Sequence, residues 1–174
     1  MRARVLPECA PGDCIGRLIV AGGLESPPSP HPYPRIPASP HMAIRIVRLG
    51  TPRAPDEGLR LGTVRRPPRG VPKSDFARRD FYDVWLPELA PSAPVVSWAL
   101  HDPWTPARWT RYERIYRREM SSPAARHLIE LLARMSYTTN LSVGCYCADP
   151  THCHRSILAA LLQAAGARIE GMRG

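Results

Sequence analysis

Apolar residues follow two different periods along residues 43–170. Short runs rich in aliphatic residues at 43–49, 59–64 and 141–147 are typical of strands. Between and after these runs, apolar residues recur at spacings of three and four, which places them on one face of a helix. Short strands that alternate with helices predict an α/β fold, a single layered domain with a mostly parallel sheet flanked by helices.

Start and stop residues indicate where the helices lie. Thr-Pro at 105–106 and Ser-Pro at 122–123 are typical helix beginnings, because proline is favoured in the first helical turn. The last helix is expected to begin near Thr151, with the Thr151 side chain as its N-cap, and to end at Gly166. A short final strand is expected over 167–170.

Residues 1–41 show neither period and hold seven prolines between positions 27 and 40. This composition predicts a disordered, Pro-rich leader. Because Met42 begins a credible compact domain, a leader that is not native is an alternative. The sequence therefore predicts one α/β domain over 42–174, of a size that buries its own core.

Composition excludes several classes of protein. Hydrophobic residues make up 44% and charged residues 22% of the chain, as in soluble globular proteins. No apolar run approaches the roughly 20 residues that span a bilayer, so no membrane association is expected. Three of the five cysteines cluster at 145–153, which suits reduced thiols or a metal site better than a disulfide framework. These features predict a cytoplasmic protein.

The formal net charge of +9 would attract polyanions. Lys73 is the only lysine, and the arginines are scattered along the chain rather than gathered in a basic tail. Nucleic acid is therefore an alternative partner, and a small anionic ligand is the first expectation.

Three cysteines, two histidines and an arginine fall within residues 145–155, which we call the cysteine loop. On a strand, side chains two residues apart share a face, so Cys145 and Cys147 are expected to point to one site. Cys153 is expected in the first turn of the following helix, where the helix dipole lowers the pKa of a thiol. Cys153 is thus the best thiolate candidate from sequence.

Two functional interpretations of the cysteine loop remain open beside a packing role for buried cysteines. In the catalytic one, Cys147 or Cys153 is the nucleophile, His154 or His152 exchanges protons, and Arg155 binds an anionic group. In the other, four residues bind zinc, although their spacing is uncommon and the strand end must bend. These four are Cys145, Cys147, Cys153 and His154. The sequence does not decide whether the protein is an enzyme.

A basic, proline-stiffened segment over 65–73, which we call the arginine loop, follows the second predicted strand. In a parallel sheet it would reach the same edge as the cysteine loop. Arg65, Arg66 and Arg69 are therefore candidates to bind a small anionic or nucleotide-like ligand between the two loops, and a solvated turn is the alternative. Trp98 and Trp104 are candidates to stack on a base.

Three segments and the cysteine loop together resemble the domain of unknown function 488 family, including its YeaO-like branch. The segments are Val64–Asp75, Leu86–Ser92 and His101–Trp104. The resemblance implies a compact α/β domain in bacterial or archaeal cytoplasm, and it implies no particular reaction. Its motif positions are Arg65, Cys145, Cys147, Cys153, His154 and Arg155. YeaO-like chains usually carry Asp-Arg-Leu-Trp-Pro-Arg-Gly where this chain has Val-Arg-Arg-Pro-Pro-Arg-Gly at 64–70.

Overall fold

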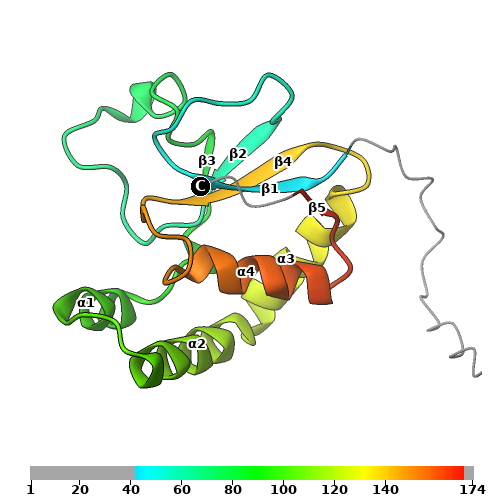
Figure 1. Cartoon of the computed structure of the whole chain (residues 1–174). Coiled ribbons are helices and arrows are strands. Elements are labelled where there is room, and N and C mark those ends of the chain that lie inside the picture. Colours follow the sequence, from blue (N-terminus) through cyan, green and yellow to red (C-terminus); the bar gives the residue numbers. More distant parts are fainter. Residues whose placement is uncertain (1–41, 171–174) are drawn as a thin grey trace, which may run out of the picture. The chain divides into compact units, whose positions relative to one another are not determined.

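A computed structural model describes residues 42–170. It confirms the α/β fold, with an all-parallel five-stranded sheet and four α-helices (Figure 1). The predicted leader over 1–41 lies outside the described residues. The elements in chain order are β1 (Ile44–Arg48), β2 (Leu59–Gly62), η1 (Lys73–Asp75), β3 (Val84–Trp85), η2 (Pro87–Leu89), α1 (Ala93–His101), α2 (Pro106–Met120), α3 (Pro123–Met135), β4 (Leu141–Cys145), α4 (His154–Ala164) and β5 (Ile169–Glu170).

The sheet has the strand order β3-β2-β4-β1-β5, so β4 lies at its centre although it comes fourth in the chain. Leu141 at the start of β4 is in register with Ile44 of β1 and with Leu59 of β2. Because all three strands are parallel, their carboxyl ends meet at one edge of the sheet. The loops that leave β2 and β4 are therefore neighbours, as the sequence predicted.

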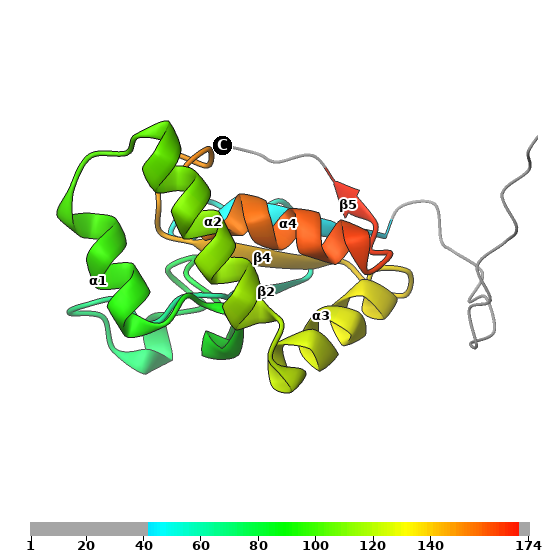
Figure 2. The ribbon, with the colours of Figure 1, turned by 90° about the horizontal axis from the view of Figure 1, so that it is seen from below.

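All four helices lie on one face of the sheet (Figures 1 and 2). The strand side chains that face them are aliphatic and fully buried, such as Ile46 of β1 and Val143 of β4. Leu158 and Leu162 of α4 pack into the same core. Within residues 42–170, none of the helices combines the length and the apolar character needed to cross a bilayer.

The other face of the sheet carries a buried polar network. Arg60 on β2 is completely buried and forms two hydrogen bonds to Glu57, from Nε to Oε1 (2.5 Å) and from an Nη to Oε2 (2.7 Å). Ser142 on β4 donates a third hydrogen bond to Glu57 (2.7 Å). Burial acts to raise the pKa of Glu57, but the hydrogen bonds from Arg60 and Ser142 outweigh it and hold this pKa below its ordinary value.

Two element boundaries differ from the prediction. The strand predicted to reach residue 147 ends at Cys145, and α4 begins at His154 with Cys153 as its N-cap. The prediction that Thr151 caps this helix was wrong. Its backbone N–H and its hydroxyl both donate to Asp149, in a turn that precedes the helix by two residues.

The helices after the Thr-Pro and Ser-Pro pairs begin where the sequence predicted. α2 starts at Pro106, and the Thr105 side chain accepts a hydrogen bond from the backbone N–H of Arg108 (3.2 Å). α3 starts at Pro123. The sequence did not predict α1, because its prolines indicate breaks. Pro94 instead occupies the first turn of α1, where proline needs no hydrogen-bond partner.

The buried Glu57–Arg60 pair generates a prediction on stability. Glu57→Gln leaves the Arg60 charge buried without a counter-charge, which we expect to lower the free energy of unfolding by about 3–5 kcal/mol. Because the pKa of Glu57 is depressed in the folded protein, its contribution is complete above about pH 4.3 and is lost as the pH falls through the lowered pKa. Urea unfolding across this pH range measures both effects. The matched control is Glu130→Gln at an exposed position of α3, and an equal loss in both variants would contradict the prediction.

Candidate functional site

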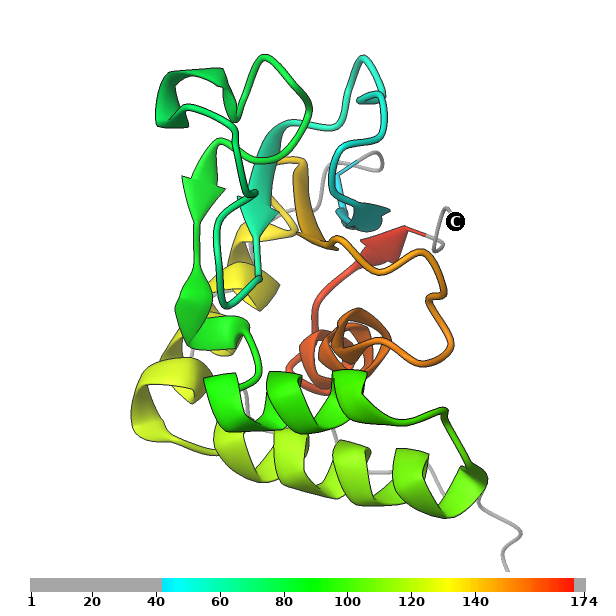
Figure 3. The same cartoon turned by 90° about the vertical axis from the view of Figure 1, so that its left-hand side faces the viewer.

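A cavity of about 480 Å³ opens at the sheet edge where β2 and β4 end. Both predicted loops line it, together with side chains from α1 and α2, so the structure confirms their proximity. Figure 3 shows α1 on the helical side of this edge and the chain that follows β4 close to it. The lining residues are Val64, Arg65, Arg66, Pro67, Pro68, Arg69, Phe81, Pro91, Val96, Ala99, Leu100, Trp104, Tyr112, Cys145, Tyr146, Cys147, His152, Cys153 and His154.

The arginine loop presents its three arginines in different ways. Arg65 donates to the carbonyl oxygens of Pro91 (2.8 Å) and Ala90 (2.9 Å), so part of its guanidinium anchors the loop to the segment before α1. Arg66 and Arg69 are exposed on the cavity wall. None of the described residues that line the cavity is an aspartate or a glutamate. The cavity is therefore positively charged.

The three thiols of the cysteine loop come together because the chain bends directly after β4. Cys145, the last residue of the strand, is buried, whereas Cys147 is exposed. The Sγ atoms of these two cysteines lie 3.5 Å apart. Cys153, which is 1% exposed, approaches from the N-cap of α4. A shared site for the thiols needs the chain to bend at the end of the strand, and this bend is present.

Among the three thiols, the structure favours Cys147 as the thiolate. Hydrogen bonds from the thiols of Cys145 and Cys153 lower the pKa of Cys147, and the nearby charge of Arg155 acts in the same direction. The hydrogen bond to Cys147 raises the pKa of Cys145, and hydrogen bonds with Cys145 and Cys147 raise the pKa of Cys153. That Cys153 is the best thiolate stays a prediction. Cys153 lies at the N-cap of α4, where the helix dipole favours a thiolate, but it is buried, which opposes the charged form.

His154 is buried, and its hydrogen bonds fix the position of its proton. Its Nε2 lies 2.7 Å from the backbone carbonyl oxygen of Thr63. A carbonyl only accepts, so Nε2 carries the hydrogen and Nδ1 has the free lone pair. Nδ1 lies 3.9 Å from Sγ of Cys153. Burial lowers the pKa of His154, so the imidazole is neutral near pH 7.

Arg155 lies in the first turn of α4, as the sequence predicted, but its side chain is buried. The side chain is 1% exposed and lies outside the residues that line the cavity. It donates to the carbonyl oxygens of Val47 (3.3 Å) and Ala148 (3.4 Å). Arg155 thus ties the cysteine loop to the end of β1 and contributes positive charge near Cys147 without facing the cavity.

Sequence reasoning missed the pairing of His152 with Asp149. Nδ1 of His152 lies 2.9 Å from the Asp149 carboxylate. The Trp104 and His152 rings stack, with their centroids 5.7 Å apart. The hydroxyl of Thr151, followed by His152, lowers the pKa of Asp149 to about 2. The signal in the sequence was the Asp-x-Thr pattern at 149–151, which is typical of an Asx turn. His152 lines the cavity, and this turn holds its ring in place.

The aromatic residues that were candidates for base stacking have separate positions. Trp104 lines the cavity. Trp98 packs against Tyr112 and has the Arg108 guanidinium 4.3 Å from its ring centre. Trp98 therefore belongs to the interface between α1 and α2, and Trp104 is the candidate that remains at the cavity.

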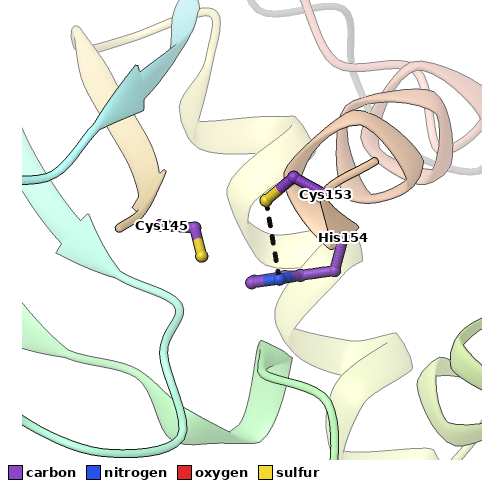
Figure 4. Close-up of side chains that lie close together, drawn as sticks. All are labelled: Cys145, Cys153 and His154. Carbon is purple, nitrogen blue, oxygen red and sulfur yellow. Dashed lines mark hydrogen bonds between the residues drawn. The ribbon is translucent and has the colours of Figure 1, made fainter. Parts of the chain in front are cut away.

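Three residues at the inner end of the cavity could hold a metal ion. Cys145, Cys153 and His154 each offer one ligand atom, and these atoms all lie within 4.8 Å of one another. Figure 4 shows their side chains pointing toward one another, from the end of β4 and from the start of α4. The cavity thus joins unpaired cations, an exposed thiol and a buried thiol–imidazole cluster.

A family model described as the active DUF488-N3 subclade matches residues 44–166. No significant match was found among curated proteins or among solved structures. The match covers both loops, all three cysteines of the cluster and most of the described fold. It establishes the family, and the YeaO-like branch stays a prediction. The chain therefore belongs to the domain of unknown function 488 (DUF488) family.

Proposed function

We propose that the protein is a cytoplasmic enzyme that binds a small anionic, nucleotide-like ligand in the cavity and acts on it through the Cys147 thiol. The observation that carries the proposal is the composition of the cavity wall, which combines three arginines with a thiol cluster and lacks carboxylates among its described residues. The matching subclade is described as active, which supports catalysis over binding alone.

The charge of the wall supports an anionic ligand. Arg66 and Arg69 are exposed on one side of the cavity, and a guanidinium binds phosphate or carboxylate through paired donors. Arg65 keeps this loop in place through its bonds to the backbone of Ala90 and Pro91. An anionic group placed here meets no carboxylate among the described residues of the wall.

The remainder of the wall supports a ligand with a flat or apolar body. The cavity is also lined by aliphatic side chains from α1, including Val96 and Leu100, and by the aromatic rings of Trp104 and Tyr112. Sites for small molecules combine such apolar surface with a few charged groups. A ring attached to a phosphate or carboxylate has both properties.

The position of Cys147 supports thiol chemistry. It is exposed on the cavity wall, whereas Cys145 and Cys153 are buried behind it. The buried thiols donate hydrogen bonds that favour the thiolate of Cys147, which is the form that attacks an electrophile. His152, held by Asp149, is the more exposed of the two histidines on the same wall and is the candidate to exchange protons.

Loss of the two exposed arginines should weaken ligand binding. Isothermal titration calorimetry with the four ribonucleoside monophosphates and phenyl phosphate should detect binding to the wild type, and the uncharged nucleosides should bind more weakly. Arg66→Ala with Arg69→Ala should raise the Kd by about tenfold or more, because a hydrogen bond to a charged group contributes about 1.5–3 kcal/mol.

The matched control is Arg114→Ala with Arg126→Ala, which removes two exposed arginines from α2 and α3. The control should retain the wild-type Kd. Equal weakening by both pairs, or no binding of any compound, would contradict the proposal. Tight, salt-dependent binding of a single-stranded oligonucleotide without binding of the mononucleotides would favour the nucleic-acid alternative.

Cys147 should be the first of the three clustered cysteines to react with iodoacetamide. Its exposure and its lowered pKa both favour alkylation, while burial protects Cys145 and Cys153. Peptide mapping by mass spectrometry over a time course measures the order, and an anion that binds in the cavity should slow the reaction. Prior modification of either buried cysteine would refute the assignment of Cys147.

A further inference from the structure

We propose that Cys145, Cys153 and His154 bind a zinc ion at the inner end of the cavity, with the fourth coordination position open toward the cavity. The site uses other side chains than the arginines that are proposed to bind the anion. A zinc ion binds Cys145 and Cys153 as thiolates, so in the metal-bound protein their sulfur atoms bind the ion and no longer donate hydrogen bonds to Cys147.

The distances between the ligand atoms suit a tetrahedral ion. Zinc binds sulfur at about 2.3 Å and nitrogen at about 2.0–2.1 Å, so the ligand atoms of a tetrahedral site lie about 3.5–3.8 Å apart. Sγ of Cys153 and Nδ1 of His154 lie 3.9 Å apart, and every pair in the group is within 4.8 Å. Rotation of the two cysteine side chains brings their sulfur atoms from these separations to the spacing of a tetrahedral site.

The hydrogen bond of His154 prepares its Nδ1 atom for a metal. Nε2–H donates to the Thr63 carbonyl oxygen at 2.7 Å, which fixes the tautomer and the orientation of the ring. Metal-binding histidines commonly donate their second ring nitrogen to a carbonyl or carboxylate in this way. Nδ1 then faces the two thiols with a free lone pair (Figure 4).

The backbone explains how two adjacent residues supply ligands to one ion. Cys153 is the N-cap of α4 and has an extended conformation (φ −130°, ψ 140°), whereas His154 is the first helical residue. The change of conformation between them turns both side chains toward the end of β4. Cys145 is held there by the pairing of β4 with β1. The three ligands therefore come from rigid elements.

The donor set selects the class of metal. Two sulfurs and one nitrogen favour zinc and other thiophilic cations over calcium or magnesium, which prefer oxygen ligands. Each ligand is almost completely buried, with exposed fractions of 7% for Cys145, 1% for Cys153 and 4% for His154. Cys147 is exposed and lies outside the group. Three protein ligands with an open fourth position is the arrangement of catalytic zinc sites.

The test measures metal in the full-length protein, purified without chelators from a zinc-supplemented culture. Elemental analysis should find about one zinc per chain. Replacement by Co²⁺ should give the visible bands of a tetrahedral ion and sulfur-to-cobalt charge transfer. Cys145→Ser and Cys153→Ser should each bind less than about a tenth as much zinc, because a thiolate ligand is lost. The matched control, Cys147→Ser, should keep the metal.

Far-UV circular dichroism shows whether each variant folds, and the cobalt spectrum of the wild type tests the site even where a variant does not. Wild-type protein without zinc that also gives no sulfur-to-cobalt band would overturn the proposal. Iron in place of zinc, or loss of zinc from Cys147→Ser as well, would overturn it too. Zinc-free protein that binds anions would refute this site alone, and zinc-loaded protein that binds no anion would refute only the function proposed above.

Discussion

Parallel pairing of β4 with β1 and β2 is the interaction on which the site depends. β4 is inserted between two strands that precede it by well over half of the described chain, in a register that places Gly144 beside Gly62 and Cys145 beside Arg48. The carboxyl ends of parallel strands share one edge, where open α/β sheets bind their ligands. Glycine at position 144 allows Leu49 to pack directly against β4, because a Cβ there would lie 2.4 Å from the Leu49 side chain.

Arginines are paired with carboxylates on the sheet face away from the helices but not on the cavity wall. On the face away from the helices, Arg45 is paired with Asp56 and Glu170, and Arg60 is paired with Glu57. These pairs neutralise buried arginines and fasten the strands from outside the core. At the cavity, the wall carries arginines without carboxylates. The charge of the arginine loop on the cavity wall is therefore not offset by a carboxylate among the described residues that line the cavity.

Short-range geometry at the ends of β4 and α4 sets the chemistry of the cysteine loop. The strand ends at Cys145, the Asp149 turn reverses the chain, and Cys153 caps the next helix. Arg155 fastens the loop to the carbonyl oxygen of Val47 on β1. As a result, thiols that are two and eight residues apart in the sequence have unequal exposure: Cys147 is exposed, whereas Cys145 and Cys153 line the cavity as buried residues.

The sequence by itself determined the α/β class, the central strand, the starts of α2 and α3, and the proximity of the two loops, because periodicity and helix-start residues are local signals and parallel pairing follows from them. Only the tertiary structure decided which groups face the cavity. Arg155 carries the motif, yet its side chain is buried and does not line the cavity, while His152 lines the cavity and is held there by Asp149 and Trp104. Exposure and hydrogen-bond partners arise from contacts between segments far apart in the chain, such as Thr63 with His154, and no local pattern encodes them.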